Sequence, residues 1–556
     1  MSQQRMQGQP MVVLGEDSQR MKDEDAQGHN ISAARAVAEA VRSTLGPKGM
    51  DKMLVSSMGD VTVTNDGVTI LEEMDIDNPT ASMIVEVAET QEDEAGDGTT
   101  TAVAVAGELL KSAEDLLEQD IHPTAIIKGF HLASEQAREE IGALAESVDP
   151  TDTDRLRKVA ETSMTGKGAE LNKELLSQLI VEAVEGVTVE ADDGSHVVDL
   201  EYVNIETQTG HSASESTLLN GAVIDKDPVQ ESMPTDLTDA NVLLTNSPIE
   251  LDETDVDAEL QLDSPDQLQS FLDSEEEQLR AKVDAIADTG ADVVFCQKGI
   301  DDMAQHYLAK RDILAVRRVK KSDLAFLKEV TGASIVSDIE NAAGDALGVA
   351  GVSRDDEDEL FYVEGTDSHG VTLLLRGSTE HVVDELERGI GDALDVVATT
   401  VSDGRVLAGG GAAEVEVASR LRNYADSVEG REQLAVEGFA DALELIPRVL
   451  ADNSGLDSID TLVDLRAAHA DDDVHAGLDV FTGDVVDTYD AGVVEPAHAK
   501  EQAVSSATEA ANLVLKIDDI ISAGDLSTEG EEDEGGAPGG MGGGGMGGMG
   551  GMGGMM

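Results

Sequence analysis

The strongest constraint on the fold is a glycine-flanked aspartate directly before a predicted helix, at residues 96–101 with the sequence Gly-Asp-Gly-Thr-Thr-Thr. The glycines let the backbone approach a ligand closely, and the helix directs unpaired amides and the positive end of its dipole at that point. This suits a phosphate. Asp97 would repel a phosphate unless a cation bridged the two, as Mg²⁺ does with carboxylate and phosphate oxygens. The alternative is an ordinary helix with Asp97 as its N-cap.

The spacing of apolar residues predicts amphipathic helices. Residues 30–45 carry apolar side chains at helical intervals, with Asn30 as N-cap and the Gly-Pro at 46–47 as the end. A long helix is predicted from Thr99, and another over residues 380–401. The apolar stripe of the latter consists of Val383, Leu386, Ile390, Leu394 and Val397.

Short runs of β-forming residues occur in other parts of the chain. Alternating valines and threonines predict a strand at residues 61–64, and the Asn-Asp-Gly at 65–67 predicts a turn. In the middle of the chain, β-type runs at 242–244, 293–295 and 371–375 alternate with helical patterns. This alternation predicts an α/β unit.

A further helix is predicted from Ser264, because residues 264–267 have the form of a capping box with Pro in the first turn. Its apolar stripe consists of Leu268, Phe271, Leu272, Leu279, Val283 and Ile286. The chain ends in an acidic run and Gly-Gly-Met repeats over residues 531–556. We expect this tail to be mobile, because a glycine-rich chain loses much entropy on ordering.

Acidic residues dominate the charged positions. The 556 residues include 115 Asp and Glu but only 37 Lys and Arg, which gives a net charge of −78. Duplex nucleic acid is an unfavourable partner, because it requires a basic surface. Such a fold repels itself in dilute buffer, whereas molar salt shortens the screening length to about 3 Å. We therefore expect a cytosol of very high salt; the alternative is a merely acidic protein of ordinary cytosol.

Length and cysteine content narrow the class of protein. A chain of 556 residues with 40% hydrophobic residues predicts several domains with sizeable cores. The single cysteine, Cys296, rules out an intramolecular disulfide and a Cys-rich zinc site, and we expect it in a core. Residues 1–30 have no apolar run of signal-peptide length, and no uninterrupted apolar stretch of about 18 residues occurs. We expect a cytoplasmic protein with no membrane partner.

Other glycine-bearing segments are weak when taken singly. The Gly-Pro within residues 44–49 is typical of helix termination, and Gly-Gly-Gly at 409–411 fits either a nucleotide backbone or a flexible junction. The P-loop sequence is absent, which excludes a standard P-loop ATPase. The basic residues at 317–321 are interpreted as neutralising local acids rather than binding nucleic acid.

Taken together and in order, residues 44–52, 65–67, 96–101 and 409–411 resemble the ATP-site motifs of the chaperonins. Further segments resemble the group II branch of that family, the archaeal thermosome subunits. They are residues 121–124, 161–167, 294–300, 375–377 and 479–483 and the Gly-Gly-Met tail. The resemblance covers nearly the whole chain.

The resemblance implies a multidomain fold with α/β and all-α parts. A mostly helical equatorial domain, a small α/β intermediate domain and an α/β apical domain are expected, with the helix from Ser264 as a protruding lid. The implied boundaries are 1–152 and 404–526 for the equatorial domain, 153–222 and 371–403 for the intermediate domain, 223–370 for the apical domain and 527–556 for the tail. Copies of this chain, or paralogous subunits, would stack as a double ring.

The same resemblance implies a site for ATP and Mg²⁺. Asp97 resembles the Mg²⁺ ligand, while Asp66 and Asp392 resemble two carboxylates that position and activate the attacking water, so these three are the expected catalytic residues. The expected nucleotide-binding residues are Thr44, Leu45, Gly46 and Pro47 around the phosphates, Gly98, Thr99, Thr100 and Thr101 at the phosphate-contacting helix start, Lys167 as a sensor of the γ-phosphate, Gly410 beside the nucleotide, and Asp479 and Glu495 near the base and ribose.

Asp392 owes its assignment to the resemblance alone. Asp392 is two residues after Ile390, which places it about 200° around the helix from the apolar stripe. This position alone predicts that its side chain is solvated. In the family this helix swings inward and brings the carboxylate to the γ-phosphate. Gly391 precedes it here, where the family more often has His.

The function implied is that of an ATP-driven chaperonin, which encloses non-native proteins in a ring chamber and folds them. Nucleotide binding and hydrolysis would move the intermediate domain, rotate the apical domain and close the lid. One alternative is a metal-dependent nucleotide phosphohydrolase without a chamber, which explains neither the lid helix nor the tail. The other is a passive holdase ring, against which the three separated carboxylates argue.

Overall fold

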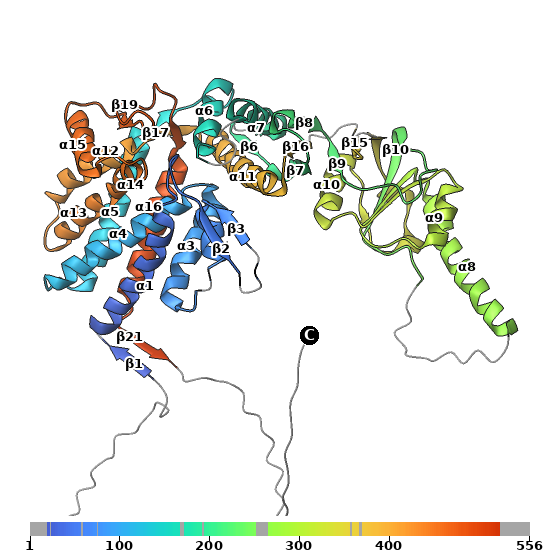
Figure 1. Cartoon of the computed structure of the whole chain (residues 1–556), viewed down its shortest axis with the longest axis horizontal. Coiled ribbons are helices and arrows are strands. Elements are labelled where there is room, and N and C mark those ends of the chain that lie inside the picture. Colours follow the sequence, from blue (N-terminus) through green and yellow to red (C-terminus); the bar gives the residue numbers. More distant parts are fainter. Residues whose placement is uncertain are drawn as a thin grey trace, which may run out of the picture. The chain divides into compact units, whose positions relative to one another are not determined.

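The computed structural model describes residues 19–22, 24–56, 59, 61–74, 76–166, 172–191, 194–251, 265–355, 358–365 and 370–522. The chain divides into two compact units. One contains both chain ends, where β1 (Gln19–Lys22) pairs antiparallel with β21 (Asp519–Ser522) (Figure 1). The other unit, Gln27–Ile517, contains the cores and the site described below.

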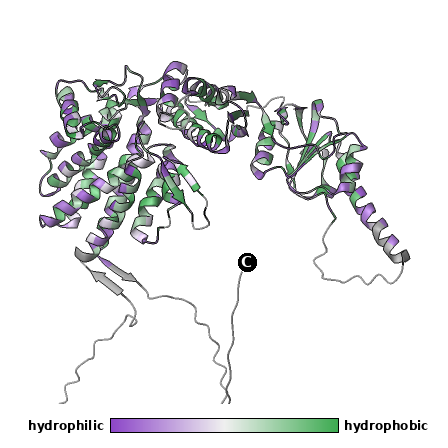
Figure 2. Cartoon of the chain, viewed as in Figure 1, coloured by the Kyte–Doolittle hydropathy of each residue, from purple (hydrophilic) through white to green (hydrophobic). Residues whose placement is uncertain are grey.

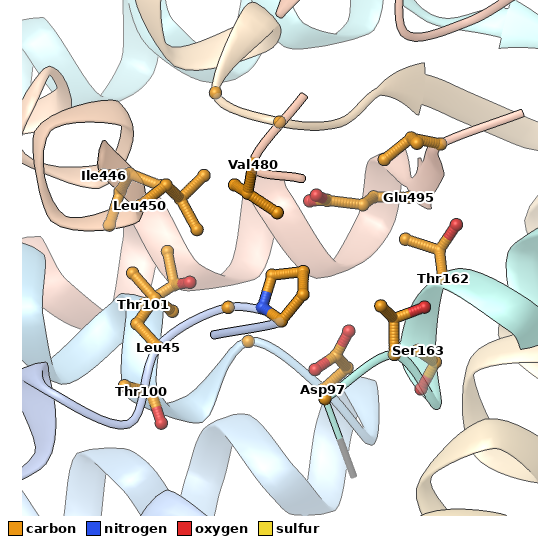
Figure 3. Close-up of a pocket in the computed structure, with 18 of the residues that line it drawn as sticks. Leu45, Asp97, Thr100, Thr101, Thr162, Ser163, Ile446, Leu450, Val480 and Glu495 are labelled. Carbon is orange, nitrogen blue, oxygen red and sulfur yellow. The ribbon is translucent and has the colours of Figure 1, made fainter. Parts of the chain in front are cut away.

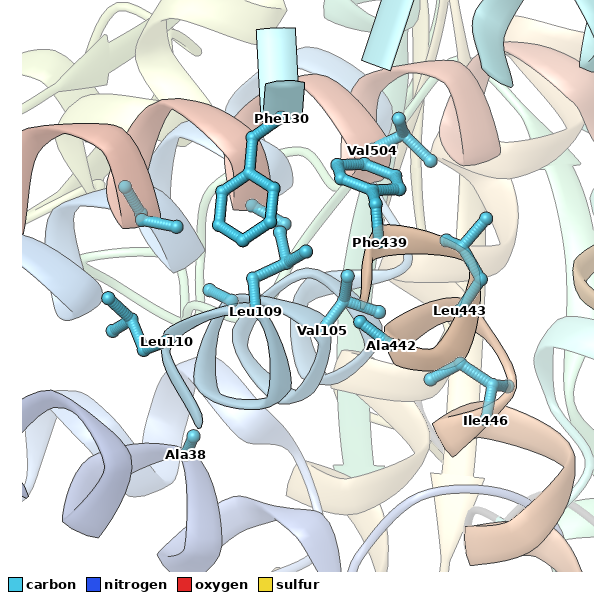
Figure 4. Packing of buried hydrophobic residues seen from close by; sticks show 14 of the residues in the cluster. Ala38, Val105, Leu109, Leu110, Phe130, Phe439, Ala442, Leu443, Ile446 and Val504 are labelled. Carbon is cyan, nitrogen blue, oxygen red and sulfur yellow. The ribbon is translucent and has the colours of Figure 1, made fainter. Parts of the chain in front are cut away.

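Helices from both ends of the sequence form a helical body around one hydrophobic core. They are α1 (Glu24–Arg42), α2 (Gly67–Glu72), α3 (Pro79–Ala95), α4 (Thr99–Glu118), α5 (Pro123–Leu144), α12 (Ala412–Ala425), α13 (Glu432–Leu443), α14 (Leu445–Asn453), α15 (Ser458–Ala470) and α16 (Ala497–Leu515). The rings of Phe130 and Phe439 meet edge to face, with centroids 6.0 Å apart, next to Leu109 of α4 (Figure 4). Segments about three hundred residues apart thus share one core.

Local sequence explains where α3 begins and ends. The Oδ1 of Asn78 accepts hydrogen bonds from the amides of Thr80 and Ala81, and Pro79 occupies the first turn, where no amide is needed. Gly96 ends the helix in the left-handed conformation, with φ of 63°. This termination positions the segment that follows it, residues 96–101.

Short antiparallel strands border the helical body. Two of these structures are hairpins: β2 (Lys52–Val55) with β3 (Val61–Thr64), and β18 (Ala476–Leu478) with β19 (Val485–Asp487). The third is a three-stranded sheet in the order β20 (Val494–Pro496), β17 (Arg405–Ala408), β4 (Glu146–Ser147). In the sheet, Leu407 pairs with Glu495. The glycines at 409–411 therefore leave β17 directly beside β20.

A second core lies between helices and a small sheet. Its helices are α6 (Thr153–Ser163), α7 (Lys173–Val187) and α11 (Glu380–Asp403), and its sheet has the order β7 (Val203–Thr209), β16 (Val371–Gly377), β8 (Thr217–Asn220). The hairpin β5 (Thr188–Glu190) with β6 (His196–Val198) follows α7. Like the first core, this second core is built from two separate stretches of sequence.

A third core surrounds a seven-stranded sheet, with the order β12 (Leu314–Arg317), β11 (Val293–Cys296), β10 (Asp236–Thr245), β14 (Gly348–Arg354), β15 (Phe361–Gly365), β9 (Ala222–Ile224), and with β13 (Ile335–Val336) beside β10. β10, β11 and β12 are parallel, whereas β14, β15 and β9 pair antiparallel. The helices of this part are α8 (Pro265–Thr289), α9 (Asp302–Ala309) and α10 (Lys321–Thr331). Figure 2 shows the parallel strands as largely apolar, as expected for strands buried on both faces.

Most predicted elements are confirmed. α4 begins at Thr99, α11 covers the predicted range with its whole apolar stripe buried, and it continues unbroken through Gly391. The three predicted β-runs of the middle are in β10, β11 and β16, and Cys296 is fully buried. In α8, Leu279, Val283 and Ile286 are buried as predicted. Ser264, the side chains of the other three stripe residues and the tail 527–556 lie outside the described residues.

Two predictions from local signals are wrong. α1 begins at Glu24, so Asn30 does not cap it; Asn30 lies buried inside the helix and accepts a hydrogen bond from the Thr80 hydroxyl. The Asn-Asp-Gly at 65–67 is not a hairpin turn, because Asp66 is the N-cap of α2. Asn30 thus has a partner fifty positions away, whereas Asp66 caps the helix that directly follows it instead of forming a hairpin turn. Among the described residues, no helix combines the length and apolar character of a membrane span.

Candidate functional site

A cavity of about 420 Å³ opens where the motif segments converge, and we call it the Asp97 cavity (Figure 3). Of the residues expected at the site, it is lined by Thr44, Leu45, Gly46, Pro47, Asp66, Asp97, Gly98, Thr99, Thr100, Thr101, Gly410, Asp479 and Glu495. Lys167 lies outside the described residues, and Asp392 does not line the cavity. Segments far apart in sequence therefore surround one space.

The geometry around Asp97 frees its carboxylate for the cavity. Gly96 and Gly98 both have left-handed backbones, with φ of 63° and 83°, and Gly98 rather than Asp97 is the N-cap of α4. The interpretation of Asp97 as an N-cap is therefore wrong. The buried side chain of Gln91 donates from Nε2 to the carbonyls of Asp97 (2.8 Å) and Ala499 (3.2 Å), which fixes this turn to the start of α16.

The turn after α1 forms another part of the wall. Gly46 has φ of 81°, and a β-carbon there would lie 2.3 Å from the Leu450 side chain of α14, so only glycine fits. Asn453 donates from Nδ2 to the carbonyl of Leu45 at 2.9 Å. The segment predicted to wrap the phosphates is thus held by α14, which comes from the other end of the chain.

Asp66 has one oxygen engaged in local structure. Its Oδ2 accepts the amide of Thr69 at 2.8 Å and the Thr69 hydroxyl at 2.6 Å. The neighbouring Asn65 donates to the carbonyl of Gly166 at 2.8 Å, which connects this turn to the segment after α6. A β-carbon on Gly67 would come within 2.5 Å of the Thr100 hydroxyl. Asp66 is therefore both the N-cap of α2 and a residue of the cavity wall.

The other side of the Asp97 cavity is built around Gly410. Its φ is 66°, and a β-carbon would lie 2.9 Å from the carbonyl of Leu478. Asp479 anchors the following turn, because its Oδ1 accepts the amides of Phe481 (2.9 Å) and Thr482 (3.3 Å). Burial alone would raise the pKa of Asp479, but these hydrogen bonds hold it below its usual range.

Glu495 and Lys500 place buried charges on the same wall. Lys500 pairs with both Glu495 and Glu414. Burial raises the pKa of Glu495, and the charges of Glu414 and Asp97 add to this, while Lys500 acts in the opposite direction. Burial would lower the pKa of Lys500, but the two carboxylates raise it above its usual range.

Asp392 lies one helical turn from the cavity. Val396, four residues later on α11, lines the cavity wall. Asp395 packs against the Asp97 turn, because a β-carbon on Gly96 would come within 2.2 Å of the Asp395 β-carbon. Burial, and next the charge of Asp392, raise the pKa of Asp395 to about 6. A small movement of α11 would therefore change the distance from Asp392 to the cavity.

The donor set of the cavity suits a phosphate chain with a divalent cation. The N-terminus of α4 supplies amides, and Thr99, Thr100 and Thr101 supply hydroxyls. Within the part of the chain that the structure describes, no three His, Cys, Asp or Glu side chains form a metal site by themselves. Within the described ranges, the carboxylate of Asp97 has no hydrogen bond or ion pair. A Mg²⁺ ion, which keeps few protein ligands and takes phosphate oxygens, fits beside it.

The sequence matches the TCP-1/cpn60 chaperonin family over residues 37–525, which is most of its length. The chain belongs to the chaperonin family. "Thermosome subunit 2" of the halophilic archaeon Haloferax volcanii is 76% identical over 541 residues, covering 97% of each chain. "Thermosome subunit beta" of Halobacterium salinarum is 74% identical over 531 residues, covering 95% of each.

A solved chaperonin structure supports the same assignment. The "Open state monomer of a group II chaperonin" from Methanococcoides burtonii matches with a TM-score of 0.61 and 42% identity, covering 76% of this chain and all of that one. The predicted chaperonin fold is thereby confirmed. This chaperonin is an ATPase that couples ATP hydrolysis to protein folding in oligomeric rings, and the phosphohydrolase and holdase alternatives find no support.

Sequence reasoning missed several residues of the chaperonin site. Lys500, Thr162, Ser163 and Thr488 line the cavity, and Glu414 pairs with Lys500. Thr162 and Ser163 lie in the segment 161–167, so the resemblance already pointed there. For Glu414 and Lys500 the only local signal was a charged residue inside an otherwise apolar or small-residue helix face. Their separation of 86 positions hides the pairing.

Proposed function

We propose that Mg²⁺-bound ATP occupies the Asp97 cavity of this chaperonin, with its phosphates at the start of α4. The observation that carries the proposal is the carboxylate of Asp97, which lines the cavity between two left-handed glycines and is not used to cap α4, because Gly98 is the N-cap. Asp97 would hold the Mg²⁺ ion, which neutralises phosphate charge. Thr99 to Thr101 and residues 44–47 would contact the phosphates.

The expected residue roles extend to the rest of the cavity. Gly410 would border the nucleotide, with Asp479 and Glu495 near the base and ribose. Asp66 and Asp392 would position and activate the attacking water, and Lys167 would sense the γ-phosphate. For Asp392 this requires α11 to move inward, and its position one turn from the wall residue Val396 supports such a movement.

We assign the three cores to the three chaperonin domains, with the boundaries expected from the sequence. The first core would be the equatorial domain, the second the intermediate domain and the third the apical domain with α8 as the lid helix. α11 belongs to the second core, yet its Val396 reaches the Asp97 cavity. Nucleotide-dependent movement of α11 would thereby be passed to the intermediate domain.

An ATPase assay combined with negative-stain imaging tests this function. In molar KCl, the purified protein should form rings and hydrolyse ATP only when Mg²⁺ is present. Monomers that hydrolyse nucleotide would argue for a phosphohydrolase, and rings without turnover would argue for a passive holdase. Imaging together with mass spectrometry of the subunits also tests the stacked double ring and its composition. The names "Thermosome subunit 2" and "Thermosome subunit beta" of two relatives favour paralogous partners in the ring. We expect the assembly in the cytoplasm, as for the chaperonin family in general.

Asp392→Ala should reduce the rate of hydrolysis by about 100-fold or more, the range typical of losing a general base. The affinity for ATP should stay the same, because Asp392 does not line the Asp97 cavity. Single-turnover hydrolysis and calorimetric ATP titration would measure the two effects. Glu387→Ala, an exposed residue of the same helix, is the matched control. Normal turnover in the Asp392 variant would remove its assignment.

The hairpin β2–β3 presents an apolar face that fits a contact between subunits. Met53 pairs with Val63 and Val55 with Val61, so all four side chains lie on one face, and they are 69%, 45%, 64% and 48% exposed. Figure 2 shows the hairpin as largely apolar. An exposed two-stranded apolar hairpin needs a partner, and a ring of subunits would supply one.

Met53→Glu combined with Val63→Glu should therefore prevent ring assembly, because it places two charges on the proposed contact face. The monomer should remain folded, because both side chains are exposed. Light scattering would measure the particle mass, and circular dichroism the fold. Met303→Glu, at an exposed methionine of α9, should leave the ring intact. Normal rings in the double variant would exclude this face as a subunit contact.

A further inference from the structure

One wall of the Asp97 cavity carries three charges that are largely withdrawn from water. The Nζ of Lys500 on α16 pairs with Oε1 of Glu414 on α12 and with Oε2 of Glu495 on β20. The side chain of Lys500 is 13% exposed and that of Glu414 is 7% exposed. We call these three residues the lysine clamp. Two carboxylates share one ammonium, so the lysine clamp has an excess negative charge.

Because of this excess negative charge, removing Lys500 would leave two carboxylates with no positive charge from the lysine clamp. The second oxygen of Glu414, Oε2, is buried and has no hydrogen-bond partner among the described residues. Burying a carboxylate without a compensating partner is costly. Lys500 is therefore the basic group that both carboxylates contact, and it is the ion-pair partner of Glu495 on this wall.

Glu495 is fixed from two sides. Its Oε2 faces Lys500, while its Oε1 lies beside Gly409, where a β-carbon would come within 2.7 Å. Gly409 is itself held by a hydrogen bond from its amide to the carbonyl of Val493, at 2.9 Å. The absence of a side chain at Gly409 leaves Oε1 beside the glycine loop that lines the cavity. Figure 3 shows the Glu495 carboxylate at this space, across from Val480.

We propose that Lys500 is a positioning residue that orients Glu495 to accept a hydrogen bond from a ribose hydroxyl, so that the cavity selects ribonucleotides over deoxyribonucleotides. This inference rests on the proposed function, in which the nucleotide occupies the Asp97 cavity. A carboxylate is a pure acceptor and a sugar hydroxyl is a donor, so the two match. A site with a buried acceptor rejects an analogue that lacks the hydroxyl, because the acceptor is then left without its partner.

Hydrolysis of ATP, 2′-deoxy-ATP and 3′-deoxy-ATP tests the proposal on the full-length protein in molar KCl. The wild type should prefer ATP to at least one deoxy analogue by about tenfold or more in kcat/KM, the loss expected for one charge-assisted hydrogen bond. In Lys500→Met this ratio should fall toward one. The KM for ATP should rise about tenfold, whereas kcat should change less than about threefold, because the Nζ of Lys500 pairs with Glu414 and Glu495 and Lys500 is not among the residues proposed to contact the phosphates.

Lys500→Met leaves two buried carboxylates uncompensated and puts the fold at risk, so a second variant is needed. The double variant Lys500→Met with Glu414→Gln removes one positive and one negative charge together, which lowers that cost. It should fold and assemble, yet lose the ribose preference. Lys516→Met, an exposed lysine at the end of the same helix, is the matched control and should retain the wild-type ratio.

The possible results are distinct. A folded Lys500 variant that keeps the wild-type ratio of ATP to deoxy-ATP would show that the lysine clamp is only a structural ion pair, and would overturn the inference. A wild type that hydrolyses ATP and both deoxy analogues equally would also overturn it, while leaving the proposed function intact. A wild type that neither binds nor hydrolyses ATP would overturn both.

Discussion

Asp97→Asn should abolish ATP hydrolysis by this chaperonin, lowering the rate by about 100-fold or more, while the rings remain assembled. Loss of one preorganised charge at a reacting phosphate costs about 10²–10³ in rate, and loss of a metal ligand acts on the same charge. Asparagine keeps the shape of the side chain but cannot neutralise a divalent cation. The expected effect is therefore electrostatic and confined to the site.

The fold should tolerate this substitution for reasons visible around the turn. Gly98 caps α4, so no cap is lost, and Gln91 contacts the Asp97 carbonyl rather than its carboxylate. We expect a change in unfolding free energy within about 0.5 kcal/mol, as for substitutions away from special features. Thermal unfolding in molar salt would measure it.

Asp93→Asn, an exposed position of the preceding helix, provides the matched control for charge. Steady-state phosphate release should be normal in this control and absent in the Asp97 variant. Removing Mg²⁺ from the wild type with a chelator should reproduce the variant. If Asp97→Asn hydrolysed ATP at the wild-type rate, the carboxylate would not be the Mg²⁺ ligand, and the proposed arrangement of phosphates at α4 would be wrong.

Local sequence predicted the parts of the site that depend on backbone conformation. Left-handed glycines such as Gly96, Gly98 and Gly410 mark turns that only glycine adopts easily, and each is found lining or flanking the cavity. The start of α4 and the apolar stripe of α11 followed from spacing alone. These features are encoded within a few residues, so a single sequence is enough to find them.

What the sequence could not predict depends on partners distant along the chain. Asn30 has the residue type of an N-cap but serves as a buried acceptor for Thr80, fifty positions away. Nothing in the sequence around Lys500 indicates its ion pair with Glu414, which lies 86 positions away. The spacing of Asp392 from Ile390 predicted a solvated residue, so only the family resemblance suggested a role in the site. Side chains that act through tertiary contacts carry no local signature.

Dialysis from molar KCl into dilute buffer should dissociate the rings and unfold the subunits. With 37 Lys and Arg against 115 Asp and Glu, acidic residues outnumber basic residues by 78 in each chain, so basic side chains cannot neutralise most of the acidic charge. In 10 mM salt the screening length is about 30 Å, so unpaired acids repel one another across a whole domain. In molar salt it falls to about 3 Å, which is shorter than the spacing of neighbouring surface charges.

Some basic residues pair with buried carboxylates, which leaves fewer of them to neutralise the carboxylates at the surface. Arg422 and Arg466 both bind the buried Glu444, and hold its pKa below the usual range although burial alone would raise it. Because these arginines pair with a few carboxylates, the negative charge of most surface carboxylates is screened only by dissolved salt.

A salt titration monitored by circular dichroism and light scattering would measure both unfolding and ring mass. We expect loss of the assembly below about 1 M KCl, where screening begins to reach beyond adjacent charges. Sucrose in place of KCl is the control, since it strengthens burial without screening charge and should fail to rescue the rings. Rings that stayed folded and active at 50 mM KCl, or that sucrose restored fully, would show that charge repulsion does not limit this protein. The acidic surface would then need an explanation other than adaptation to a salt-rich cytosol.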